Sequence, residues 1–163
     1  MLRFHPVKSA ADEAAVLAIY QSNPDYFTLT EQSQPTLAMV QEDAAARPAE
    51  VSKWDKHYGL LKIDDRPVGV LDRLNGYPEA DIVYIGLLML AKSEQGQGLG
   101  QRVMRGLSKQ FKQQGFKRVR VAVVSANTGA LTFWEQLGFK PLGESQAQVG
   151  AAPQAVVILE QAL

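Results

Sequence analysis

The sequence predicts an α/β (α+β) fold, with a mixed, mostly antiparallel central sheet of about seven strands and helices on both of its faces. Residues 82–90 are almost wholly apolar, as expected of a central strand that is covered on both faces. After this strand the chain alternates between helical and strand periodicity. Its 163 residues are close to the roughly 150 that one domain commonly takes, so we expect residues 1–163 to form a single domain.

The first part of the chain contains a strand followed by two predicted helices. Residues 2–7 have the pattern of a short strand, and Ser9 is placed to cap a helix with an apolar inner face. Residues 22–34 include an Asn-Pro pair and are followed by another proline, which predicts a loop. A second helix is expected over residues 36–46.

The remaining elements form a hairpin and then an alternation of strands and helices. An Asp-Asp-Arg-Pro turn joins two strand patterns, which is a hairpin signal. Gly115 and Gly138 are placed to end two amphipathic helices in the left-handed conformation. The predicted elements are strands at 58–63, 68–74 and 82–90, a helix from 99 to 111, a strand at 119–124, a helix from 130 to 137, and strands at 140–145 and 155–160.

The composition argues against several classes of partner. Seventeen basic residues balance seventeen acidic ones, whereas nucleic-acid binding usually needs a basic excess on one face. No stretch approaches the roughly 20 apolar residues of a membrane span, and the first residues do not resemble a signal peptide. We therefore expect a cytoplasmic protein whose partners include neither nucleic acid nor a membrane.

The chain contains no cysteine. Disulfides, zinc–thiolate sites and a cysteine acyl-enzyme are therefore impossible, and we expect no metal site. Any acyl transfer must use another nucleophile or pass directly from donor to acceptor.

A glycine-rich segment lies between the apolar strand and the helix that follows it. Glycines let the backbone approach a ligand closely, and the free amides of a helix start suit an anion such as pyrophosphate. The dinucleotide spacing fails because residue 101 is glutamine, and Gln101-Arg102 stands where a P-loop needs Lys-Ser/Thr. A glycine-rich turn without a ligand is the alternative. The segment comprises Gln95, Gly96, Gln97, Gly98, Leu99 and Gly100.

A second motif follows the next strand, and the two motifs together resemble those of the GCN5-related N-acetyltransferases, the GNAT superfamily. The first motif, Gln/Arg-x-x-Gly-x-Gly/Ala, is matched by Gln95, Gly98 and Gly100. With the order of the elements, the resemblance covers nearly the whole chain. The second motif is matched by Asn127, Ala130, Phe133, Trp134, Glu135, Gly138 and Phe139.

The resemblance implies a site for acetyl-CoA. In the family, the strand before the glycine loop separates from its neighbour, and the pantetheine arm lies in the gap. Backbone groups of Leu88, Met89 and Leu90 would then bind this arm, and the Leu88 amide would face the thioester oxygen. The amides of residues 95–100 would hold the pyrophosphate. Asn127 would contact the coenzyme, although asparagine is also a preferred helix cap.

Trp134 departs from the pattern of many family members, which have a tyrosine there that protonates the departing thiolate. An indole cannot supply that proton usefully. The coenzyme would then leave as a thiolate, since its thiol pKa lies near the cysteine value of roughly 8.5. Transfer of acetyl to a primary amine in a ternary complex is the implied activity. The alternative is a regulatory module that binds acyl-CoA, or a relative without activity.

The acceptor, a small molecule or a protein amino group, is expected opposite the coenzyme. Tyr84 shares strand parity with Leu88 and is a candidate for the cleft, where a base or a water relay must take the amine proton. Tyr26, Phe27, Asp72 and Tyr77 are expected to line the acceptor site. Asp72, Glu79 and Asp81 lie at strand edges, either as candidate bases on the acceptor side or as solvated surface residues. Homodimers are common in the family, so a homodimer is a further expectation.

Overall fold

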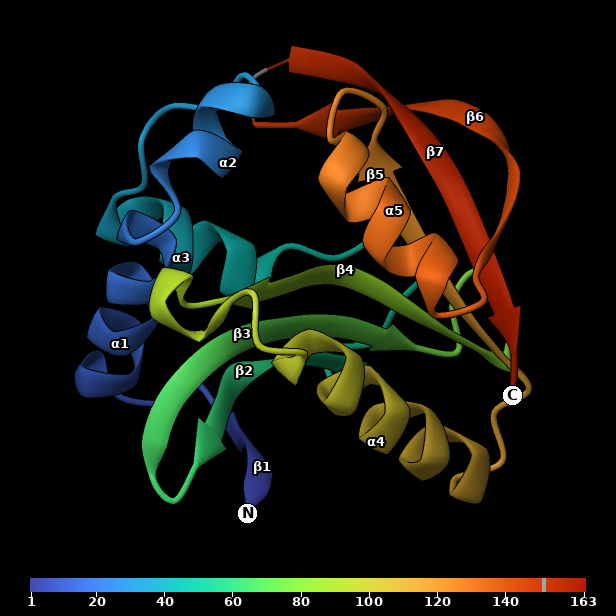
Figure 1. Cartoon of the computed structure of the whole chain (residues 1–163), viewed down its shortest axis with the longest axis horizontal. Coiled ribbons are helices and arrows are strands. Elements are labelled where there is room, and N and C mark those ends of the chain that lie inside the picture. The colour runs from blue at the N-terminus through green and yellow to red at the C-terminus, as the bar shows by residue number, and fades with distance from the viewer. Residues whose placement is uncertain (151) are drawn as a thin grey trace.

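The computed structural model describes residues 1–150 and 152–163. It contains a seven-stranded sheet in the order β1-β2-β3-β4-β5-β7-β6, in which β4 and β5 are parallel and the other neighbours are antiparallel (Figure 1). The predicted mixed sheet is therefore confirmed. The strands are β1 Leu2–Pro6, β2 Lys56–Ile63, β3 Arg66–Asn75, β4 Ile82–Leu90, β5 Arg118–Val124, β6 Lys140–Val149 and β7 Ala152–Ala162.

Helices cover both faces of the sheet, as predicted. One apolar core joins the sheet to α4 and α5, and a second core joins the opposite face to α1, α2 and α3. Figure 1 shows α4 and α5 in front of the sheet, with α1 and α3 at its other side. The helices are α1 Ala10–Gln21, α2 Pro24–Leu29, α3 Leu37–Ala45, the 3-10 turn η1 Lys92–Glu94, α4 Leu99–Gln113 and α5 Thr128–Gln136.

Local sequence signals account for most helix boundaries. The Ser9 side chain accepts a hydrogen bond from the Asp12 amide, and the Asp12 carboxylate accepts one from the Ser9 amide, which completes a capping box at α1. Gly115 and Gly138 follow α4 and α5 with φ angles of 96°, as expected of glycines that end helices.

The prediction of a loop over residues 22–34 is wrong in part, because Pro24–Leu29 forms the helix α2. Pro24 occupies the first helical position, where its missing amide costs nothing and its fixed φ angle already suits a helix. The Asn-Pro pair therefore begins a helix here, and the prediction took it only as a turn signal.

The two parallel strands in the middle of the sheet separate partway along their length. They pair from Ile82 with Arg118 to Ile85 with Val121 and no further, although β3 stays paired with β4 up to Leu90. A β-bulge at Gly86 coincides with the separation, since Asp72 pairs with Leu87 but Arg73 pairs with Ile85. Because a bulge bends its strand, it directs the end of β4 away from β5 and opens a gap between them.

Candidate active site

Two cavities meet at this gap. The first, of about 560 Å³, extends from the glycine segment and is called the loop cavity; the second, of about 330 Å³, contains Asp43 and Asp72 and is called the acidic cavity. Because both cavities are lined by the same residues at their junction, two ligands could meet there. The shared residues are Tyr26, Leu88, Met89, Ala130 and Trp134.

The glycine segment forms the mouth of the loop cavity and the start of α4. Gly96 and Gly98 have φ angles of 78° and 76°, and a Cβ added to either would meet no atom within 4 Å. The first intrahelical bond of this turn runs from the Arg102 amide to the Gly98 carbonyl, so the amides of residues 99–101 have no helical partner. This arrangement provides open space and free donors for an anion.

The backbone of β4 offers a further donor inside the gap. The Ala91 amide donates to the carbonyl of Val68 on β3, at 2.8 Å. Because backbone groups alternate sides along a strand, the amides of Leu90 and Leu88 are directed toward the gap, and that of Met89 is directed toward β3. This alternation leaves the amides of Leu88 and Leu90 available to a ligand in the gap, and it does not support the expected contact of a ligand with the Met89 backbone.

Trp134 on α5 and Asn127, which caps that helix, both line the loop cavity, and Trp134 also lines the acidic cavity. Trp134 is 6% exposed and packs edge-to-face against Phe133 and Phe139 at centroid distances of 5.0 and 4.9 Å. Asn127 accepts a hydrogen bond from the Ala130 amide at 3.2 Å and also lines the loop cavity. Its capping role is therefore present, and its side chain still borders the space that a ligand would take.

Asn23 is a buried polar residue that the sequence reasoning missed. Its Nδ2 amide donates to the carbonyl of Leu90 at 3.0 Å, and its Oδ1 accepts from Gln95 at 2.7 Å. Gln95 also donates to the Leu90 carbonyl, at 2.9 Å. The Gln95 side chain therefore fixes the glycine segment to β4 and α2. The sequence did contain a signal for this role, because an asparagine directly before a proline is typical of a helix start. The loop prediction for residues 22–34 did not use it.

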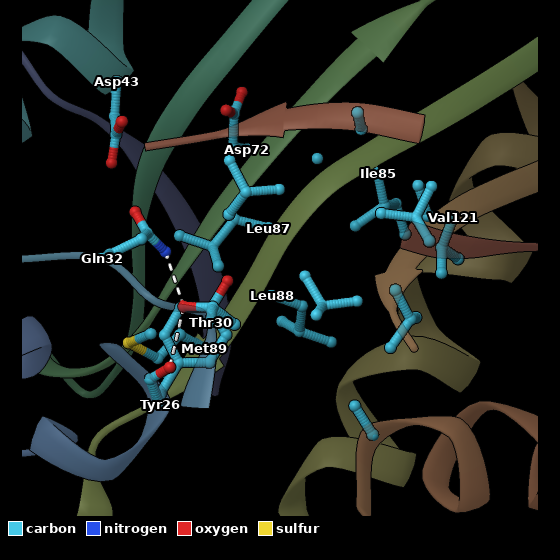
Figure 2. Close-up of a pocket in the computed structure, with 18 of the residues that line it drawn as sticks. Tyr26, Thr30, Gln32, Asp43, Asp72, Ile85, Leu87, Leu88, Met89 and Val121 are labelled. Carbon is cyan, nitrogen blue, oxygen red and sulfur yellow. Dashed lines mark hydrogen bonds between the residues drawn. The ribbon is translucent and has the colours of Figure 1, made fainter. Parts of the chain in front are cut away.

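The acidic cavity has carboxylates at one end and the gap at the other (Figure 2). Lys56, whose side chain is 8% exposed, lies 2.7 Å from Oδ1 and 2.9 Å from Oδ2 of Asp72. Burial raises the pKa of Asp72, and the neighbouring Lys56 opposes that rise. Asp72 also lies over the bulge, because a Cβ added to Gly86 would be 3.4 Å from its Oδ2.

Asp43, on α3, is a second carboxylate of this cavity, and the sequence reasoning did not select it. Its Oδ2 accepts a hydrogen bond from the Tyr20 hydroxyl at 2.8 Å, and that hydroxyl lies 2.6 Å from the hydroxyl of Tyr58. Burial is the main cause that raises the pKa of Asp43. No local pattern distinguishes this aspartate from solvated ones, because only tertiary packing brings α3 to the cavity.

Only some of the residues predicted for the acceptor site line the acidic cavity. Tyr26, Phe27 and Asp72 line the acidic cavity. Tyr77 is not part of its lining and instead packs edge-to-face on Tyr84 at 5.5 Å. Tyr84 does line the cavity, but the parity argument behind it was wrong.

The bulge at Gly86 explains that error. Tyr84 pairs with Leu74, and Leu87 pairs with Asp72, so these four residues share one face of the sheet. The extra residue shifts the alternation, and Tyr84 therefore shares a face with Leu87 rather than with Leu88.

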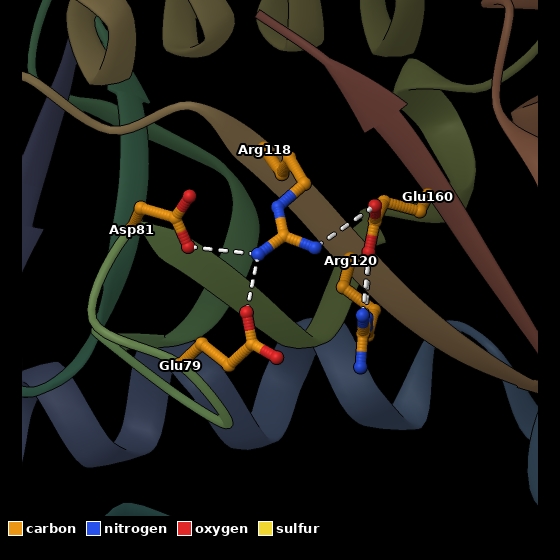
Figure 3. A network of polar contacts seen from close by, with 5 residues as sticks. All are labelled: Glu79, Asp81, Arg118, Arg120 and Glu160. Atoms are coloured by element: carbon orange, nitrogen blue, oxygen red, sulfur yellow. Dashed lines mark hydrogen bonds and ion pairs between the residues drawn. The ribbon is translucent and has the colours of Figure 1, made fainter.

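Glu79 and Asp81 lie outside both cavities. They accept hydrogen bonds from Arg118, which also lies 3.6 Å from Glu160, and Glu160 in turn pairs with Arg120 (Figure 3). This network joins the turn before β4 to β5 and β7. The reading of both acids as surface residues is therefore the correct one.

Residues 1–150 and 152–163 contain neither a cluster of metal ligands nor a helix of membrane-spanning character. No three histidine, aspartate or glutamate side chains in these ranges gather as metal ligands do. No helix within them has the length and apolar character that crossing a membrane requires.

The separated β4–β5 pair and the glycine segment at the start of α4 are the two backbone features that the family resemblance implies. The sequence matches the acetyltransferase (GNAT) family over residues 16–139, so the chain belongs to that family. The family resemblance and the fold class expected from the sequence are thus confirmed. No curated protein matches the sequence significantly.

Solved structures agree with this assignment. An acetyltransferase from Thermus thermophilus superposes with a TM-score of 0.82 at 26% identity, over 100% of this chain and 97% of that chain. The ribosomal-protein-S18-alanine N-acetyltransferase from Escherichia coli has a TM-score of 0.68 at 13% identity, over 99% and 94%. An N-acetyltransferase from Staphylococcus aureus has a TM-score of 0.67 at 13% identity, over 99% and 98%. The last two similarities concern the fold alone.

Proposed function

We propose that this chain transfers the acetyl group of acetyl-CoA directly to a primary amine in a ternary complex. The observation that carries the proposal is the junction of the two cavities at Leu88 and Trp134. In the proposed arrangement acetyl-CoA enters from the loop cavity and the amine enters from the acidic cavity. The acceptor is a small molecule or a protein amino group.

The residues of the loop cavity fit acetyl-CoA. The open space beside Gly96 and Gly98 and the free amides of residues 99–101 suit the pyrophosphate. The amides of Leu88 and Leu90 line the path for the pantetheine arm, and the side chain of Asn127 borders it. The coenzyme supplies an acetyl group already activated as a thioester.

At the junction, the Leu88 amide is the donor for the thioester oxygen, where negative charge grows during transfer. Removal of one such preorganised donor in other enzymes costs about 10²–10³ in kcat. The amine nitrogen bonds to the acetyl carbon, and the carbon–sulfur bond breaks with its electron pair on sulfur. Trp134 lines the end of the cavity where the coenzyme thiol would lie, and it does not donate to the departing thiolate the proton that a tyrosine would give.

The amine must lose a proton before or during its attack. Asp72 lies over the bulge and pairs across the strands with Leu87, the residue before Leu88, and burial raises its pKa. A water between Asp72 and the amine is the proposed route for this proton. Tyr84, on the same face, is the second candidate.

The first experiment measures the melting temperature with saturating acetyl-CoA, with ATP and NAD as phosphate-bearing controls. A ligand at 100 times its Kd adds about 2.7 kcal/mol to the free energy of unfolding, so a specific upward shift is expected. An amine panel, followed by free-thiol release, then tests transfer. A shift without turnover of any amine would favour the alternative, an acyl-CoA-binding regulatory module or an inactive relative. A cytoplasmic location and a homodimer stay predictions.

A further inference from the structure

The charge of the acidic cavity points to the chemistry of its ligand. Among the described residues that line it, the side chains with a formal charge are Asp43 and Asp72, and no lysine, arginine or histidine is present. Apolar side chains such as Phe27, Leu87 and Met89 share the remaining wall with uncharged polar groups, among them Thr30 and Gln32. A ligand that carries positive charge and an aliphatic portion would match both features.

The two carboxylates differ in how their charge is compensated. Both oxygens of Asp72 lie within 2.9 Å of Lys56 Nζ, which forms an ion pair. The same Nζ reaches Asp43 only at its backbone carbonyl, at 2.9 Å. Within residues 1–150 and 152–163, no cationic side chain pairs with the Asp43 carboxylate.

A pair of tyrosines holds the Asp43 carboxylate in place. The Tyr20 hydroxyl donates to Oδ2 of Asp43, so at the 2.6 Å contact between the two hydroxyls Tyr58 is the donor. The hydrogen bond therefore fixes one carboxylate oxygen, and Oδ1 receives no hydrogen bond from the part of the chain that the structure describes. A half-buried carboxylate with one free oxygen is suited to accept from an ammonium group.

Asp43 is also separated from the point of transfer. Figure 2 shows Leu87 between Asp43 and Leu88, with Gln32 and Thr30 along the same side of the cavity as Asp43. A single ammonium group at Asp43 would leave the junction empty. A molecule with two amines and an aliphatic spacer could place one at each end.

We propose that the acceptor is a small diammonium molecule, in which Asp43 binds one ammonium group while the other loses a proton to water and is acetylated, as the free amine, beside Leu88. This inference rests on the proposed function and names its substrate class. The cavity of about 330 Å³ lies at the lower end of the roughly 300–1,000 Å³ range of small-molecule sites, which suits a short diamine.

The test compares matched acceptors with the wild-type protein. Diamines with spacers of three, four and five carbons are assayed beside the monoamine of the same length, and 5-aminopentanoate is added as an acceptor with a negative end. A charge-assisted hydrogen bond contributes enough to give the best diamine a kcat/KM advantage of about tenfold or more over its monoamine. The anionic acceptor is expected to be the poorest.

The variant Asp43→Asn retains an acceptor for the Tyr20 hydroxyl but removes the charge, so the diamine advantage should fall to near one. Glu42→Gln is the matched control, because it removes the same charge from an exposed neighbouring position of α3 and should keep the advantage. The wild-type comparison decides the question even if the Asn variant does not fold.

The outcomes separate the inference from the proposed function. Equal kcat/KM for diamines and monoamines, or an advantage that survives Asp43→Asn, would overturn the diammonium acceptor while acetyl transfer itself stands. Acetyl-CoA binding with no transfer to any amine would overturn the proposed function, and the inference with it.

Discussion

The side-chain amide of Gln95 donates a hydrogen bond to Oδ1 of Asn23 at 2.7 Å, and so joins the glycine segment to the residue that directly precedes α2. Because α2 carries Tyr26 and Phe27, this single bond connects the wall of the loop cavity with the wall of the acidic cavity. In the proposed enzyme, the coenzyme site and the acceptor site therefore share one structural anchor.

Substitution of Asn23 by alanine should weaken both sites. The change removes bonds to the carbonyls of Ile19 and Leu90 and leaves Gln95 with one partner fewer, all in a buried region. Loss of a buried hydrogen-bonding partner costs about 1–3 kcal/mol, measurable by urea unfolding. The acceptor KM should rise with it. The control is Gln97→Ala, which removes only an exposed hydrogen bond to the Ser93 carbonyl. If the two variants were equally stable, Asn23 would not be the anchor of these two sites.

Two glycines of one region should respond in opposite directions to the same substitution. Gly98 has a φ of 76°, so Gly98→Ala should lower the free energy of unfolding by roughly 1–2 kcal/mol through backbone strain and weaken acetyl-CoA binding. Gly106 lies inside α4 with no atom within 4 Å of an added Cβ, so Gly106→Ala should stabilise by about 0.5–1 kcal/mol. Thermal melts with and without acetyl-CoA measure both effects. If both substitutions shifted the melting temperature in the same direction, the backbone strain assigned to Gly98 would be contradicted.

Trp134→Phe should retain most of the activity. The phenyl ring keeps the apolar wall at the junction, and the indole that it replaces is not a usable proton donor in transfer. Trp134→Ala, by contrast, should cost about 3–5 kcal/mol of stability because it leaves a cavity between the two aromatic neighbours. The measurement is the steady-state kcat for acetyl transfer. If kcat of Trp134→Phe fell by orders of magnitude at unchanged stability, the indole would take part in the chemical step.

The capping carboxylate of α1 should make stability depend on pH in the acid range. Backbone hydrogen bonds from Lys8 and Ser9, together with the Ser9 and His5 side chains, lower the pKa of Asp12 to about 2. A lowered folded-state pKa contributes stability above the ordinary value of 3.8, and this contribution is lost as pH falls toward 2. The Tm difference between wild type and Asp12→Ala should therefore shrink between about pH 4 and pH 2. A difference that stays constant over this range would contradict the assignment.

The sequence determined the elements whose causes are local. Ser9 caps α1 through its own first turn, and the apolar residues 82–90 form a strand covered on both faces. The glycine segment was likewise placed correctly at the start of α4, because backbone freedom at Gly96 and Gly98 follows from residue type. The first family motif lies in this glycine segment, and the second runs from Asn127 to Phe139 around α5, so the fold and the family were predictable.

The acceptor side depended on relations between distant segments. Asp43 reaches the acidic cavity only because α3 packs against α1 and the sheet, and the charge state of Asp72 depends on Lys56, sixteen positions earlier. The bulge at Gly86 is a property of the register between β3 and β4, and it moved Tyr84 to the other face from the one its parity predicted. The tertiary structure alone decided these features, because hydrogen-bond register and side-chain burial are set by partners that no local pattern identifies.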